Sequence, residues 1–127
     1  LLDVPEVQKL IVYSSTLSRK DIISKWGYSF HVAGLGIPYT GKWIGEITPN
    51  YITKEEGAHQ LLKAAERRQQ DTVAIGCSEK DVGLLAFVGF GIAMGNGDKE
   101  VKVAARHVTD PIREDGLWKA FEFLGLL

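Results

Sequence analysis

The sequence has little of what several protein classes require. It contains one cysteine and three histidines among 127 residues, without the Cys/His spacing of a zinc site, so an internal disulfide and a structural zinc site are excluded. No apolar run approaches the roughly 18 residues of a membrane-spanning helix. Fifteen Lys and Arg against sixteen Asp and Glu give a net charge of -1, without the basic excess of nucleic-acid binders. We therefore expect a cytoplasmic protein with no nucleic-acid or membrane partner.

The composition that remains is that of a folded domain. Hydrophobic residues make up 45% and charged residues 24% of the chain, as in ordinary globular proteins. A length of 127 residues corresponds to one domain, or to one domain with a fragment of another. The chain begins LLDVPEVQKL, with neither an initiator Met nor a signal-peptide pattern. We interpret this start as a cut or as the middle of a longer chain.

Residues 1–48 carry the pattern of a small β-rich segment. Ser18 and Asp21 form an S-x-x-D start signal for a short helix that Gly27 ends after Trp26. Alternating apolar residues and turn signals predict strands at 7–13, 28–35 and 42–48, with a loop at 36–41 between the last two. Pro49 and Asn50 mark the end of this segment.

Residues 49–127 have a different sequence pattern, in which short apolar runs alternate with helical periodicity. A Thr53–Glu56 capping box opens a helix through about Gln69. Further helices are predicted from Ser78, over 98–105 and over 114–124, and strands over 72–75, 90–94 and 107–109. Uninterrupted apolar strands between helices are typical of a parallel sheet covered on both faces. The loops that follow these strands should meet at the carboxyl edge of the sheet, where open α/β folds bind ligands.

Three features of this segment have both a functional and a structural interpretation. The loop from Gly76 to Asp81 enters a helix, whose N–H groups favour anions, but it also reads as a plain N-cap. Cys77 in this loop has the position of an activated thiol, yet no arginine or histidine accompanies it, so a small buried thiol is favoured. Lys54 lies in the first turn of its helix, where a cation opposes the helix dipole. That placement indicates a function or an ordinary surface lysine.

The stretches EITPNYITKEEG, VAIGCSEKDVGLLAFVGFGIAMGNGDKEVKVAARHVT and EDGLWKAFEFLGL together resemble the C-terminal part of a Cof-type hydrolase of the haloacid dehalogenase (HAD) superfamily. The family's fourth motif, G-D-x-x-N-D, aligns with G-C-S-E-K-D, and its A-M-G-N-A turn aligns with A-M-G-N-G. The resemblance implies an α/β fold: half of a Rossmann-like core over 49–127, preceded by the end of a cap over 1–48. It also implies a phosphatase that acts on small phosphorylated metabolites.

The resemblance assigns roles to particular residues. Lys54 falls on the family's catalytic lysine, which holds charge on the transferred phosphoryl group. Asp81 falls on the distal acid of the fourth motif, which completes a Mg²⁺ site. Lys54, Lys80 and Asn96 are then the expected substrate-binding residues. In the family an aspartate near the N-terminus attacks the phosphate and forms an aspartyl-phosphate.

The sequence departs from this family pattern at the motifs that carry the catalytic and metal-binding residues. It contains no D-x-D-G nucleophile motif and no second motif ending in Thr or Ser before Gly-Arg. Cys77 replaces a magnesium-binding aspartate and Lys80 replaces an asparagine, although Mg²⁺ prefers oxygen ligands. We therefore expect this chain alone to be inactive. The first hypothesis is a phosphatase fragment that needs a complementary N-terminal half. The second is a non-catalytic binding protein that pairs as a homodimer or with another chain, and the third is a generic α/β nucleotide-binding module.

Overall fold

The computed structural model describes residues 8–35 and 40–127. Internal contacts divide the chain after Ile52 into two compact units, which are described separately here. Residues 36–39 of the predicted 36–41 loop, and the first residue of the predicted 7–13 strand, lie outside the described residues. No helix in the described ranges is long and apolar enough to cross a bilayer.

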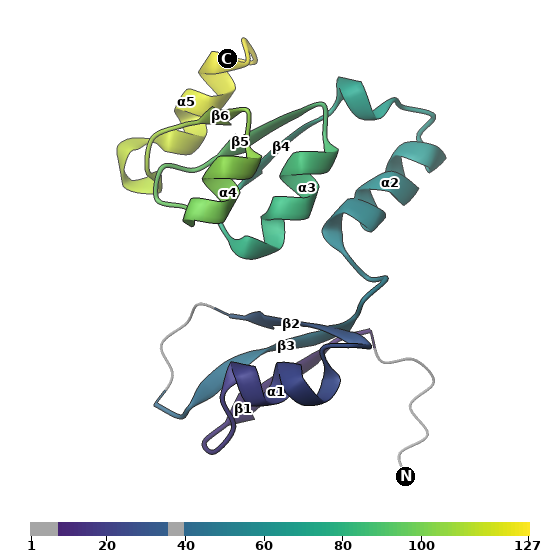
Figure 1. Ribbon diagram of the computed structural model, residues 1–127. Helices are drawn as coiled ribbons and strands as arrows, with labels where there is room; N and C mark the ends of the chain where they lie inside the picture. Colours follow the sequence, from purple (N-terminus) through teal and green to yellow (C-terminus); the bar gives the residue numbers. More distant parts are fainter. Residues whose placement is uncertain (1–7, 36–39) are drawn as a thin grey trace. The chain divides into compact units, whose positions relative to one another are not determined.

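The first unit is an antiparallel sheet with one helix (Figure 1). Its elements are β1 (Leu10–Ser14), α1 (Arg19–Trp26), β2 (Phe30–Gly34) and β3 (Trp43–Pro49), and the strand order is β1-β3-β2. Ile22 of α1 packs against Val32 and Ile47 of the sheet to form the core. The predicted helix start is confirmed, because the Ser18 amide donates to Asp21 Oδ2 at 2.7 Å and the Asp21 amide to Ser18 Oγ at 3.3 Å.

The second unit is built on a parallel sheet in the order β4-β5-β6 (Figure 1). The strands are β4 (Val73–Gly76), β5 (Phe90–Ala93) and β6 (His107–Val108). The helices are α2 (Lys54–Ala64), α3 (Val82–Phe87), α4 (Lys99–Ala104) and α5 (Gly116–Phe123), with short 3₁₀ turns η1 (Gln69–Asp71), η2 (Glu79–Asp81) and η3 (Ile112–Glu114). This arrangement confirms the predicted α/β fold with parallel strands.

Helices cover both faces of the parallel sheet, as the apolar strands predict. Leu85 of α3 and Val101 of α4 form a buried cluster with Ala93 of β5. Because successive strand residues point to opposite faces, Phe90 lies on the other face of β5. There the Phe123 ring of α5 lies 6.0 Å from the Phe90 ring, and it stacks on His107 at 4.0 Å. The α5 helix therefore closes the face opposite to α3 and α4.

Helix α2 ends at Ala64, five residues before the predicted end at Gln69. Glu66 adopts a left-handed backbone with φ 52°, and the Arg67 amide donates to the Leu62 carbonyl at 3.0 Å. This six-to-one bond is that of a Schellman motif, which usually places glycine at the left-handed position. The sequence has Glu66 there instead, so the usual stop signal is missing and the predicted helix was too long.

Candidate functional site

The loops that follow the three parallel strands are hydrogen-bonded to one another at the carboxyl edge of the sheet. The Asp98 amide donates to the Cys77 carbonyl at 3.0 Å, and the Gly95 amide donates to the Asp110 carbonyl at 3.2 Å. The Glu79 amide donates to Asp98 Oδ2 at 3.1 Å. The loops after β4, β5 and β6 thus form one framework, and the polar side chains they carry are held beside one another.

Close packing between two of these loops explains one of their glycines. A Cβ atom on Gly97 would lie 2.9 Å from the Cys77 carbonyl oxygen and 3.0 Å from that of Met94. A side chain at this position would therefore push the loop after β5 away from the loop after β4. The glycine at the end of the G-N-G turn is therefore a packing requirement of this edge of the sheet.

Lys54 and Asp81 form an ion pair at this edge of the second unit. Lys54 is the first residue of α2, and Thr53 caps the helix by accepting from the Glu56 amide at 3.2 Å. Lys54 Nζ lies 2.5 Å from Asp81 Oδ1. The Lys54 side chain is 52% exposed, whereas that of Asp81 is 11% exposed. The unfavourable place of a lysine at a helix start is therefore explained by this partner, and part of its ammonium group still faces solvent.

Asp81 is held by the loop from which it projects. Its second oxygen, Oδ2, accepts from the Cys77 amide at 2.9 Å, the Ser78 amide at 3.0 Å and Ser78 Oγ at 3.1 Å. Burial alone would raise the pKa of Asp81, but the Lys54 ammonium and the Cys77 and Ser78 amides outweigh it and lower the pKa to about 2. Asp81 is therefore a carboxylate at neutral pH, with both oxygens engaged.

These bonds correct the expectation that the loop amides bind an anion. The amides of Cys77 and Ser78 already donate to Asp81, and the Glu79 amide already donates to Asp98. A phosphate would have to displace a carboxylate of the chain itself to reach them. The side chain of Lys54, which is about half exposed, is an anion-binding group that this geometry leaves accessible.

Cys77 is exposed, so the expectation of a buried thiol was wrong. It follows β4 directly, where the chain leaves the buried Gly76 and turns outward. Lys80 lies in the 3₁₀ turn η2, partly buried, between Ser78 and Asp81. The structure therefore brings Cys77 and Lys80 into the same loop as Asp81, as their adjacency in the motif requires.

Asn96 lies in the neighbouring loop, and its position is fixed by the loop after β6. Its Oδ1 accepts from the Ile112 amide at 2.8 Å. The side-chain oxygen therefore serves the framework, which leaves the amide nitrogen as the group with which Asn96 would contact a substrate. The motif predicts Asn96 as a site residue, but it does not predict that the side-chain oxygen accepts from the Ile112 amide.

Asp98 is the residue that sequence reasoning missed. The sequence pattern predicts only a helix start at Asp98, yet the Asp98 carboxylate accepts from the Glu79 amide and the Asp98 amide donates to the Cys77 carbonyl. Its position directly after the G-N-G turn and before α4 was the available signal, because carboxylates at helix starts commonly accept from backbone amides.

The described residues do not fit a magnesium ion by themselves. Across residues 8–35 and 40–127, no group of three His, Cys, Asp or Glu side chains could hold a metal. The two oxygens of Asp81 are engaged by Lys54 and by the Cys77–Ser78 backbone, and the Cys77 thiol is a soft ligand that Mg²⁺ disfavours. The geometry therefore favours Asp81 as the group that positions Lys54, a role different from the metal ligand expected from the motif.

A parallel sheet with helices on both faces and a polar framework at its carboxyl edge defines an α/β protein of the class that binds ligands at that edge. The sequence model of the haloacid dehalogenase-like hydrolase family matches residues 5–121. The chain belongs to this family.

Relatives and solved structures agree with this assignment. Over 83 residues the chain is 40% identical to a phosphoglycolate phosphatase of Methanosarcina acetivorans, a match that covers 65% of this chain and 37% of that protein. An uncharacterized protein in the pdhA 5′ region of Geobacillus stearothermophilus is 35% identical over 82 residues, covering 65% of this chain and 86% of that protein.

The fold matches a solved HAD subclass IIB sugar phosphatase with a TM-score of 0.79 and 24% identity, over 96% of this chain and 45% of that one. The chain thus spans less than half the length of that phosphatase and of the Methanosarcina protein. The fold predicted from the family resemblance is confirmed by this likeness.

Proposed function

We propose that this chain is the C-terminal part of a Cof-type HAD phosphatase that acts on small phosphorylated metabolites in the cytoplasm. The single observation that carries the proposal is the Lys54–Asp81 pair at the carboxyl edge of the parallel sheet. Asp81 accepts four hydrogen bonds, one from Lys54 and three from Cys77 and Ser78. Because the loop holds the Asp81 carboxylate in place, the carboxylate in turn holds the Lys54 ammonium in a fixed position. Residues 1–48 would then be the end of the cap.

Lys54 has the chemistry that this role needs. An ammonium group offers three N–H donors, and Asp81 takes one of them. The remaining donors can bind the oxygens of a phosphate monoester and stabilise the charge that develops as the phosphoryl group is transferred. The name of the Methanosarcina relative makes phosphoglycolate, a small phosphorylated acid, a first candidate substrate. The attacking carboxylate and any Mg²⁺ ligands would have to come from a complementary N-terminal half.

We expect inorganic phosphate to bind the chain weakly through Lys54, with a Kd in the millimolar range or above, because few polar contacts are available to it. The test is a ¹⁵N–¹H chemical-shift titration. Lys54→Gln keeps a donor for Asp81 but removes the charge, and it should abolish the shifts of residues 77–81 and 95–97. Lys63→Gln, at the other end of α2, is the matched control and should leave them unchanged. Phosphate-induced shifts at these residues that survive Lys54→Gln would contradict the proposal.

A non-catalytic protein that pairs with itself or with another chain is the second candidate. Cys77 and Lys80 favour it, since both stand where the phosphatase motif has other residues. So do the apolar side chains that the second unit exposes on its sheet and on α5, namely Val73, Val108, Leu117, Trp118 and Phe123.

Either candidate leaves apolar surface that a partner would cover. In the described part of the chain no strand pairs with the outer edge of β4, and open edges and exposed apolar patches promote association. We expect the purified chain to form a homodimer in the absence of a complementary half. Size-exclusion chromatography with light scattering checks this, and a stable 14.0 kDa monomer at micromolar concentration would argue against it.

A further inference from the structure

The amino edge of the parallel sheet carries a pocket that is separate from the Lys54–Asp81 pair. It has a volume of about 380 Å³ and is lined by Arg68, Gln69, Gln70, Ala86, Phe87, Val88, Gly89 and Arg106. These residues belong to η1, to the end of α3 and to the segments that lead into β5 and β6. Because the strands are parallel, the Lys54 pair and the framework loops lie at the opposite ends of the same strands. The volume is within the usual range for small-molecule sites, roughly 300–1,000 Å³.

The backbone around the pocket is fixed by hydrogen bonds. The Gly89 amide donates to the Gln69 carbonyl at 3.0 Å, and the Arg106 amide donates to the Gly91 carbonyl at 2.8 Å. Gln69 Nε2 also donates to the Phe87 carbonyl. A Cβ atom on Gly89 would clash with the Gln70 carbonyl, so the glycine permits the close approach of η1 to the segment before β5. The pocket is thus built from segments that are tied together before any ligand arrives.

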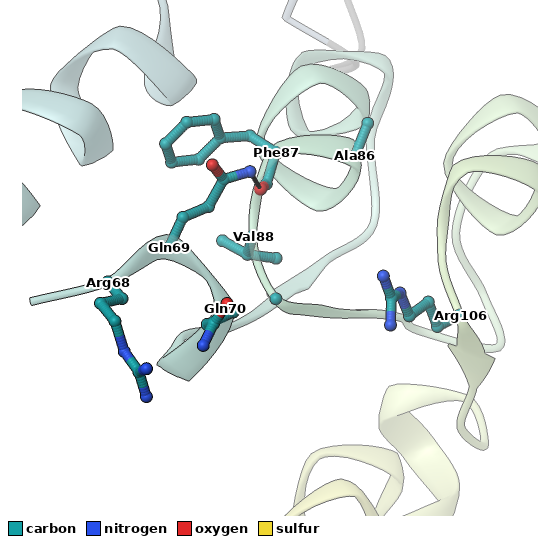
Figure 2. Close-up of a pocket in the computed structure, with 8 residues that line it drawn as sticks. Arg68, Gln69, Gln70, Ala86, Phe87, Val88 and Arg106 are labelled. Atoms are coloured by element: carbon teal, nitrogen blue, oxygen red, sulfur yellow. Dashed lines mark hydrogen bonds between the residues drawn. The ribbon is translucent and has the colours of Figure 1, made fainter.

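The two arginines of the pocket are in different electrostatic situations. Arg68 is bound to Asp71, with Nε 2.8 Å from Oδ2 and Nη2 3.0 Å from Oδ1. Figure 2 shows Arg68 and the two glutamines on one side of Val88, with the Arg68 guanidinium directed away from Arg106, which lies on the other side. Within the described ranges, no carboxylate forms an ion pair with Arg106. Arg106 therefore keeps its full charge available to a ligand.

The rest of the lining is suited to an organic anion. The Arg106 guanidinium can bind a carboxylate or a phosphate through paired N–H donors. Gln70 adds amide donors across the pocket, on the other side of Val88. Ala86, Phe87 and Val88 supply the apolar part of a lining that is otherwise mostly polar. We propose that this pocket is a second binding site, for a small organic anion that joins a phosphate or carboxylate group to an apolar or aromatic body. The proposal does not depend on the phosphatase role of Lys54.

The test is a ¹⁵N–¹H titration of the 127-residue chain with phenyl phosphate, benzoate and inorganic phosphate. Phenyl phosphate should shift the amides of Gln69, Gln70, Gly89 and Arg106. The difference in affinity between phenyl phosphate and inorganic phosphate measures how much the apolar part of the lining contributes to binding. The difference between phenyl phosphate and benzoate shows which anionic group the pocket prefers. Because a phosphate probe can also reach Lys54, the titration is repeated in Lys54→Gln. The shifts at the amino edge should persist in that variant.

Two variants locate the site. Arg106→Gln removes the charge of an exposed side chain and should weaken phenyl phosphate binding at least about tenfold. Ala86→Phe should block the pocket without removing any charge. Arg113→Gln, an exposed arginine in η3 outside the pocket, is the control and should bind as the wild type does. The proposal is overturned if no probe shifts the amino-edge amides at tens of millimolar, or if the shifts survive both Arg106→Gln and Ala86→Phe.

Discussion

Replacing Asp81 by alanine should destabilise the second unit by about 3 kcal/mol, the scale expected when a buried, charged hydrogen-bond acceptor is removed. The substitution leaves the Cys77 and Ser78 amides without their acceptor and Lys54 without its partner. Equilibrium denaturation in urea measures the loss. Asp71→Ala is the matched control, because Asp71 pairs with Arg68 on the surface and exposed pairs contribute little. Equal losses for the two variants would contradict the role given to Asp81.

The same carboxylate makes the stability of this unit depend on pH in the acid range. The pKa of Asp81 falls from its ordinary value of 3.8 to about 2 in the folded chain, so the folded state binds this proton less tightly than the unfolded state. The stabilisation is therefore complete above pH 3.8 and is lost as the pH falls through about 2. Its size is at most about 2 kcal/mol, reduced toward about 1 kcal/mol because solvent screens the partly exposed Lys54.

Asp81→Asn isolates this contribution, since it keeps an acceptor oxygen but cannot titrate. The difference in unfolding free energy between wild type and Asp81→Asn should be constant near neutral pH and should shrink below pH 3.8. A difference that stays the same down to pH 2 would mean that the Asp81 carboxylate has an ordinary pKa.

The fold could be predicted from the sequence wherever local signals and periodicity agreed. The Ser18–Asp21 capping pair marked the start of α1, and the apolar runs marked the three parallel strands. The end of α2 was missed because Glu66 takes a left-handed backbone that glycine usually occupies. The turn from α2 into η1 imposes this conformation, and the type of side chain at position 66 does not predict it.

The candidate site was predictable in its members but not in their bonding. Motif spacing identified Lys54 and Asp81, and the structure joins them. Motif spacing could not show whether the amides of Cys77 and Ser78 donate to an external anion or to the Asp81 side chain, because both arrangements satisfy the same donors. The amino-edge pocket gave no sequence signal at all. Arg68 and Arg106 are far apart in the chain, and only the parallel pairing of β4, β5 and β6 brings them to one edge.

The 127-residue chain alone should show no phosphatase activity toward an aryl phosphate, with or without Mg²⁺. The sequence has no D-x-D-G nucleophile motif, and Asp81 is engaged by Lys54 and its own loop. Without a carboxylate that accepts the phosphoryl group, a positioned lysine can bind phosphate but gives little rate acceleration. Turnover that co-purifies with the chain and disappears in Lys54→Gln would contradict this, because it would require a nucleophile within these residues.

Cys77→Asp distinguishes a fragment of an active enzyme from a protein that has lost catalysis. The substitution puts a hard oxygen ligand in place of an exposed thiol at the motif position where HAD phosphatases have aspartate. In the isolated chain it should change neither Mg²⁺ affinity nor turnover, because the described residues hold no other free ligand set.

Together with a complementary N-terminal half, supplied by the gene's own upstream sequence or by a relative, Cys77→Asp should tighten Mg²⁺ binding. Turnover should then depend on Lys54 and not on Lys63. If the complemented Cys77→Asp protein binds Mg²⁺ and remains inactive, the chain is the non-catalytic member that its Cys77 and Lys80 suggest.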